Sequence, residues 1–133
     1  MIAGAETLRA QIEDLAGRWD GRSRRLLSAT AEADAPDPSA LVFASRRAGD
    51  RWFAWEQPSS SFALAGVGSA AEVVSRGADR FAQIDADCTR LVREALVSGP
   101  PDLPAGAGAT WMGGFSFAPE GGRAAHWSSL PPA

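Results

Sequence analysis

The chain has 133 residues, a formal net charge of -3 and 45% hydrophobic residues. That length suits one domain with its own core, and the apolar content excludes an intrinsically disordered protein. The lack of a basic excess argues against nucleic acid as a partner. Because no signal peptide or 18-residue apolar run occurs, we expect a cytoplasmic protein without a membrane partner.

The residue inventory restricts the chemistry further. All 13 basic residues are arginine, so the chain supplies no lysine amine for a Schiff base or for general-base catalysis. Cys88 is the single cysteine, which excludes an internal disulfide and a thiolate zinc site within one chain. His126 is the single histidine, which argues against a two-histidine metal site.

The first third of the chain predicts a helix, a strand and a second short helix. An apolar stripe at three- and four-residue spacing predicts a helix that ends at Asp20-Gly21, and its members are Ala5, Leu8, Ile12, Leu15 and Trp19. Residues 25–33 alternate like a strand. After a loop over residues 34–39, Asp37 with Pro38 predicts a cap for a helix to about Arg46. The run 40–44 equally fits a strand.

The middle of the chain predicts a hairpin. The aromatic segment 51–56 and the apolar segment 61–67 are separated by turn residues 57–60, which favours two antiparallel strands. Residues 72–76 predict a third strand that returns across the same sheet.

A longer helix and a last strand follow. Residues 78–97 carry an apolar stripe that includes Phe81, Ile84, Cys88 and Leu91, and the opposite face is polar, with Arg80, Gln83, Asp87, Arg90 and Glu94. Residues 110–117 alternate like a strand, with a central Gly113-Gly114 that indicates a bulge or a close neighbour. The sum predicts an α+β fold: a mainly antiparallel sheet with helices packed on one side.

No residue stands out as a catalytic group. Cys88 lies on an apolar helical stripe, which favours a packing role over a nucleophile, because a nucleophile needs a base nearby. His126, between Ala125 and Trp127, is more typical of a surface or packing residue than of a general base.

Three further groups have a structural and a functional interpretation. The pairs Gly113-Gly114 and Gly121-Gly122 do not fit a phosphate-binding loop, since no helix pattern follows the first pair. Two arginine clusters favour solvated surface over anion binding, and they are Arg22, Arg24 and Arg25, then Arg46, Arg47 and Arg51. Glu56 favours a structural ion pair over a contact with a substrate domain.

Three motifs in order resemble isochorismate synthases, which belong to the chorismate-utilising enzymes. The first is the hairpin Trp52-Phe53-Ala54-Trp55-Glu56-Gln57-Pro58 with Phe62-Ala63-Leu64-Ala65-Gly66-Val67-Gly68. The second is Gly113-Gly114-Phe115-Ser116-Phe117, and the third is Trp127 with Leu130-Pro131-Pro132-Ala133. The resemblance covers roughly residues 25–133. Ala118 and Leu130 depart from the aspartate and phenylalanine that the family often has there, which leaves the subfamily open.

The resemblance implies that residues 1–133 form a single N-terminal domain of a longer enzyme whose catalytic portion lies downstream. Family members bind chorismate with Mg²⁺ held by carboxylates, while a lysine activates water and a glutamate assists loss of a hydroxyl. No catalytic, cofactor-binding or metal residue of that set transfers to this chain. The parent enzyme would make isochorismate for menaquinone or siderophore biosynthesis.

The same resemblance predicts the partner. Residues 110–117 and the hairpin around Trp52, Phe53 and Trp55 should form a surface that the missing catalytic portion covers, and the isolated chain would be prone to self-association. Two alternatives stay open. One is another chorismate-utilising enzyme, an anthranilate or aminodeoxychorismate synthase component, and the other is a stand-alone, non-enzymatic interaction domain.

Overall fold

The computed structural model describes residues 4–34 and 37–117 of the chain. Its elements, in order, are α1 (Ala5–Arg18), β1 (Leu27–Ala29), α2 (Pro38–Ser45), β2 (Trp52–Gln57), the 3-10 turn η1 (Pro58–Ser60), β3 (Phe62–Val67), α3 (Arg80–Arg93) and β4 (Leu96–Ser98). This mixture of helices with small sheets confirms the α+β class. Within the described residues, no helix has both the length and the apolar character that a membrane span requires.

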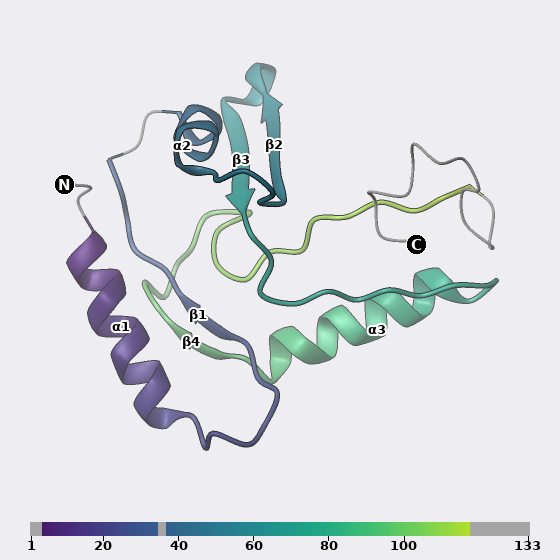
Figure 1. The fold of residues 1–133 in the computed structure, drawn as a ribbon, viewed down its shortest axis with the longest axis horizontal. Helices are drawn as coiled ribbons and strands as arrows, with labels where there is room; N and C mark the ends of the chain where they lie inside the picture. Colours follow the sequence, from purple (N-terminus) through teal and green to yellow (C-terminus); the bar gives the residue numbers. More distant parts are fainter. Residues whose placement is uncertain (1–3, 35–36, 118–133) are drawn as a thin grey trace.

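The first layer brings together elements that lie far apart in the sequence, α1 and β1 with β4. β1 and β4 pair in parallel, with Leu27 opposite Leu96, and α1 packs against both strands (Figure 1). Leu15 on α1 is completely buried. Gly4 precedes α1 with a φ of 94°, a conformation that glycine adopts without strain. Since this sheet is parallel and separate from the β2–β3 sheet, the prediction of one mainly antiparallel sheet with helices on one side is not confirmed.

The second layer is the predicted hairpin with α2 against it. β2 and β3 pair antiparallel, with Trp52 opposite Val67, and η1 with Ser61 at a φ of 50° makes the turn. The prediction of a capped helix at α2 is confirmed, because the Asp37 carboxylate accepts a hydrogen bond from the backbone N–H of Ala40 at 2.9 Å. The alternative strand over residues 40–44 is therefore wrong.

The long helix is shorter than predicted. α3 stops at Arg93, and the backbone N–H of Leu96 donates to the carbonyl of Leu26, so the chain enters the parallel ladder instead of continuing as a helix to residue 97. β1 is likewise shorter than the predicted strand over residues 25–33. Its length is set by β4, because only Leu27–Ala29 have a partner in that ladder.

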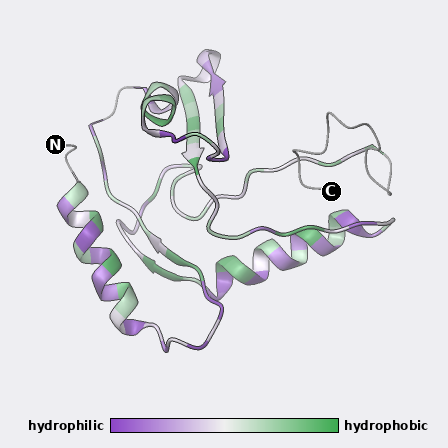
Figure 2. Cartoon of the chain, viewed as in Figure 1, coloured by the Kyte–Doolittle hydropathy of each residue, from purple (hydrophilic) through white to green (hydrophobic). Residues whose placement is uncertain are grey.

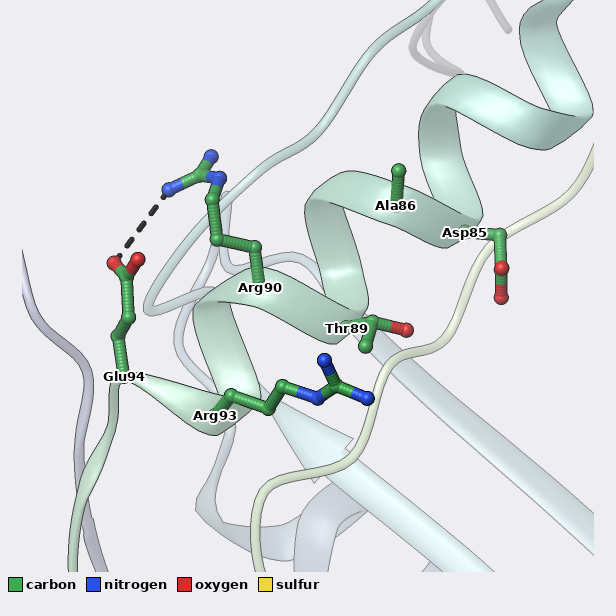
Figure 3. A pocket seen from close by; sticks show the side chains of 6 residues that line it. All are labelled: Asp85, Ala86, Thr89, Arg90, Arg93 and Glu94. Atoms are coloured by element: carbon green, nitrogen blue, oxygen red, sulfur yellow. Dashed lines mark ion pairs between the residues drawn. The ribbon is translucent and has the colours of Figure 1, made fainter.

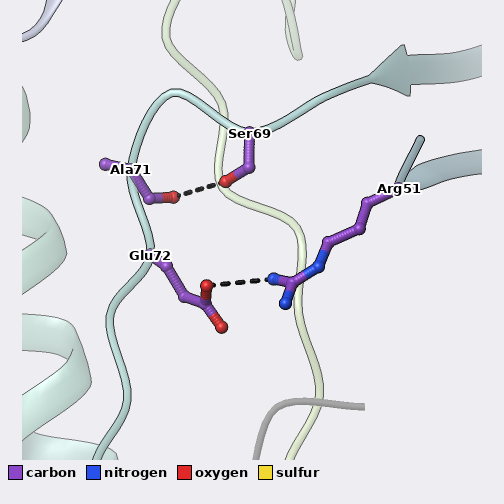
Figure 4. A network of polar contacts seen from close by, with 4 residues as sticks. All are labelled: Arg51, Ser69, Ala71 and Glu72. Carbon is purple, nitrogen blue, oxygen red and sulfur yellow. Dashed lines mark hydrogen bonds and ion pairs between the residues drawn. The ribbon is translucent and has the colours of Figure 1, made fainter. Parts of the chain in front are cut away.

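Two predicted strands are wrong. Residues 72–76 form no strand. Glu72 forms an ion pair with Arg51 at 2.9 Å (Figure 4). The Ser75 hydroxyl bonds to the Gln83 side chain on α3. Residues 110–117 form none either, and Phe115 packs against Phe81 with ring centroids 4.6 Å apart. In both segments side-chain contacts take the place of a ladder.

The core of the described part is very small. Leu15 and Val42 are its buried hydrophobic side chains, whereas Phe43, Trp52 and Trp55 are each 45–60% exposed. Figure 2 shows the same pattern, with apolar stretches spread over every element rather than gathered inside. The expected exposure of the hairpin aromatics is thus confirmed for Trp52 and Trp55, whereas Phe53 is half-buried.

Candidate functional site

The arginine cluster at residues 46–51 is divided among separate contacts. The Arg46 guanidinium lies 4.2 Å from the centre of the Phe43 ring and 5.0 Å from that of Trp52, and those two rings meet edge to face at 6.2 Å. Arg51 forms an ion pair with Glu72 (Figure 4). The backbone N–H of Arg47 donates to the Asp50 carboxylate. The three arginines therefore make separate contacts with α2, β2 and the neighbouring loops, and they do not converge on one anion-binding site.

The cluster of Arg22, Arg24 and Arg25 lies in the exposed loop after α1. Asp20 organises this loop, since its carboxylate accepts from the backbone N–H of Ser23 at 2.9 Å, from that of Arg22 at 3.0 Å and from the Ser23 hydroxyl. These bonds, the one from the Ser23 backbone above all, lower the pKa of Asp20 from 3.8 to about 2. Arg22, Arg24 and Arg25 are exposed to solvent, as the prediction of a solvated surface expects.

Cys88 is half-buried on α3 rather than buried as its apolar stripe suggested. Burial raises the pKa of its thiol, and the neighbouring carboxylates of Asp87 and Asp85 raise it further. A raised pKa keeps the sulfur protonated at neutral pH and opposes nucleophilic chemistry. His126 and the pair Gly121-Gly122 lie outside the described residues.

The remaining candidates form no polar site. Gly113-Gly114 lies in an irregular segment, not in a strand, and no helix follows it within the described part. Glu56 makes no ion pair with any residue in 4–34 or 37–117, so its predicted structural pairing is wrong for that part. It lines a shallow depression of about 340 Å³ with Asp37, Pro58 and Phe62.

A second depression, of about 480 Å³, lies on the polar face of α3 (Figure 3). Five of the six residues that line it belong to this helix and the sixth is its C-cap, Glu94; the five are Asp85, Ala86, Thr89, Arg90 and Arg93. Arg90 is held by Asp87 at 3.1 Å and by Glu94 at 3.7 Å, and each of these side chains is about half exposed. The arrangement is typical of a solvated helix surface and not of a catalytic cleft.

Sequence reasoning missed the buried arginine of this region. Arg80 was assigned to the polar face of the helix, yet it is only 6% exposed. Its guanidinium donates to the carbonyls of Gly77 at 3.1 Å, Ser116 at 3.2 Å and Phe117 at 3.4 Å, and it lies 4.3 Å from the Phe81 ring. Helical periodicity carries no signal for it, because the partners lie in a distant irregular segment.

The described residues do not fit a magnesium site. Among them, no three histidine, cysteine, aspartate or glutamate side chains come close enough together to hold a metal ion. Mg²⁺ prefers several oxygen ligands, and each of the two depressions has only two carboxylates in its lining, Asp37 with Glu56 and Asp85 with Glu94.

Comparison with known proteins assigns this chain to a protein family. The sequence profile described as chorismate binding enzyme matches residues 11–133, which is most of the chain. The chain belongs to the chorismate binding enzyme family. The hairpin β2–β3, α2, α3 and β4 all lie inside the matched range, so the family relationship covers every layer of the fold.

Within the chorismate binding enzymes, the chain is similar to the salicylate biosynthesis isochorismate synthase of Pseudomonas aeruginosa. The two are 32% identical over 126 residues, which cover 92% of this chain and 24% of the relative. The chain thus spans about a quarter of the length of that enzyme. No solved structure matches the chain.

Proposed function

We propose that this chain is the N-terminal scaffold region of an isochorismate synthase, and that the parent enzyme converts chorismate to isochorismate in the cytoplasm. The 32% identity to an isochorismate synthase of which the chain covers only 24% carries the proposal. The chain is long enough for strands and helices that support a catalytic portion, and it is too short to be the equivalent of the whole relative.

The chemistry of the chain supports this division of labour. Hydration at one ring carbon with loss of hydroxyl from another requires a general base and a general acid near the substrate. The 133 residues contain no lysine, and the buried Arg80 is committed to backbone carbonyls and a ring. Neither depression brings an acid and a base together in an enclosed space. The reacting groups are therefore assigned to the downstream portion.

Magnesium is assigned to the downstream portion as well. Since no ligand set for it occurs among residues 4–34 and 37–117, no step of the reaction is placed on these side chains. Their proposed role is structural. The hairpin packs with α2, and α1 packs with β1 and β4, and a catalytic portion would be positioned against these two units.

The test compares two polypeptides from the native gene. The product of the longer open reading frame and residues 1–133 alone are incubated with chorismate and Mg²⁺, and isochorismate is measured by chromatography. We expect turnover by the longer product, loss of that turnover when the metal is chelated, and none above background by residues 1–133.

Two results would contradict the proposal. One is isochorismate formation by residues 1–133 alone, and the other is a native gene with no coding sequence beyond Ala133. If the longer product instead made an aminated product with ammonia, the parent would be an anthranilate or aminodeoxychorismate synthase component, and the family would stand while the activity changed.

A further inference from the structure

The apolar stripe of α3 is a helical surface that the described part leaves largely uncovered beyond Phe81, whose ring packs on Phe115. Phe81 is 52% exposed and Val92 40%, and Ile84, Cys88 and Leu91 between them are half-buried. α3 makes no extensive contact with another helix or with a strand of the described chain, and Figure 1 shows it extending away from α1, α2 and the hairpin, with its C-terminal end leading into β4. The stripe runs the whole length of the helix.

Only the first turn of α3 is fastened to the rest of the protein. Arg80 binds the carbonyls of Ser116 and Phe117, Phe81 stacks on Phe115, and Gln83 bonds to Ser75. Beyond Gln83, every hydrogen bond and ion pair found for α3 side chains within the described residues is internal to the helix or its C-cap. The later two-thirds of the stripe therefore has no such anchor.

This state is unfavourable for a helix of 14 residues. Isolated helices of that length are marginal in water, and most of their stability in proteins comes from packing of the apolar face. The polar face cannot supply that stability, because the ion pairs of Arg90 with Asp87 and with Glu94 are about half exposed to solvent; Figure 3 shows the pair with Glu94. The stripe is thus the face that another surface must cover.

We propose that the α3 stripe, defined as Phe81, Ile84, Cys88, Leu91 and Val92, is the surface on which the catalytic portion of the same polypeptide packs. This inference rests on the proposed function. The length of the Pseudomonas relative supports the choice of occupant, since three-quarters of that enzyme lies outside the region that this chain matches. A portion of that size has ample surface to bury one helix face.

Cys88 provides a probe for this contact, because it is the single cysteine of residues 1–133 and lies at the centre of the stripe. The rate of maleimide labelling at Cys88 is measured by mass spectrometry of its peptide, in residues 1–133 alone and in the longer native product. We expect labelling to be at least tenfold slower in the longer product at the same pH. In denaturant, the two rates should be equal.

Equal rates in the two folded proteins would overturn the inference. Slow labelling of residues 1–133 alone, together with a dimeric mass by light scattering, would also overturn it in favour of a second copy. The proposed function is tested by a separate measurement, the formation of isochorismate by the same longer product. If the longer product makes isochorismate but Cys88 is labelled as fast as in residues 1–133, only the α3 contact is contradicted. If Cys88 is protected in the longer product but no isochorismate forms, only the proposed function is contradicted.

Two serine substitutions in the longer product provide a matched control. Ile84 lies on the stripe and Ala86 on the polar face, two residues away on the same helix. We expect Ile84→Ser to raise the labelling rate of Cys88 and lower the Tm by several degrees, and Ala86→Ser to change neither. Equal effects of the two would overturn the inference, and the wild-type comparison holds even if Ile84→Ser does not fold.

Discussion

Arg80 carries a charge into the interior with no carboxylate within ion-pair distance among residues 4–34 and 37–117. Burying a charge is expensive unless hydrogen bonds and nearby dipoles replace its water. Three backbone carbonyls and the Phe81 ring fill that role. The planar guanidinium can reach several carbonyls at once, which the single ammonium of a lysine does less well.

Replacing Arg80 by methionine should destabilise the protein. The change removes hydrogen bonds to a charged donor, and we expect a loss of about 1.5–3 kcal/mol in the free energy of unfolding, measured by urea denaturation. Arg9→Met is the control, because Arg9 forms an exposed pair with Glu13 and its side chain is 83% exposed. That change should have little effect. Equal losses in the two variants would refute the structural role of Arg80.

Asp20 should titrate far below an ordinary aspartate. Its pKa falls from 3.8 to about 2 because backbone and hydroxyl donors of Ser23 and Arg22 bind the ionised form. The folded-state pKa is the lower one, so the ionised carboxylate stabilises the folded loop above pH 3.8, and this contribution disappears as the pH falls through about 2. Carboxyl NMR should show a midpoint near 2 that is absent in Asp20→Asn. A folded-state midpoint near 3.8 would contradict this assignment.

At the scale of elements, the confirmed predictions rest on signals that lie close together in the sequence. Asp37 and Pro38 set the start of α2 within one turn, and the hairpin needs only its own two strands and the turn between them. The stripe that ends near Trp19 likewise identified α1. Such elements can be predicted from the sequence because the signals that define them, a cap, a turn or a periodic apolar stripe, lie within the element itself.

The errors concern elements that depend on distant partners. Leu96–Ser98 continues the apolar stripe of α3, and only its pairing with β1 makes it a strand. Residues 110–117 alternate like a strand and residues 72–76 were predicted to return across the hairpin sheet, yet no strand of the described chain pairs with either segment. Arg80 was misplaced for the same reason. The assignment of every catalytic and metal residue to a region outside this chain stays a prediction.

Two glycines of α1 should respond oppositely to alanine. A Cβ at Gly4 would lie 2.5 Å from the carbonyl oxygen of Glu32, and the backbone there has a positive φ, so we expect Gly4→Ala to destabilise by about 1–3 kcal/mol. Gly17 is helical with nothing within 4 Å, and Gly17→Ala should stabilise by about 0.5–1 kcal/mol. Thermal and urea unfolding measure both. The same sign for the two would contradict the docking of α1 against residue 32.

The described part of the molecule exposes many large apolar side chains, from Ile12 on α1 to Phe117 near its end. Patches of this extent usually belong to an interface.

Residues 1–133 in isolation should therefore bind the dye ANS under native conditions, with a fluorescence increase that urea removes. The longer native product, with these faces covered, should bind less dye per mole at the same concentration. Circular dichroism in the far ultraviolet serves as the control that residues 1–133 retain helix. Fluorescence no higher than that of the longer product would show that the apolar faces are closed without further chain.

The parallel pairing of β1 with β4 also has a consequence for biosynthesis. Leu27 leaves the ribosome well before Leu96, with α2, the hairpin and α3 made in between. At about 5–20 residues per second, β1 waits roughly 3–14 s for its neighbour. During that interval α1 can fold but has only half of its sheet. The speed at which α2 to α3 is translated therefore sets how long the nascent chain depends on protection by chaperones.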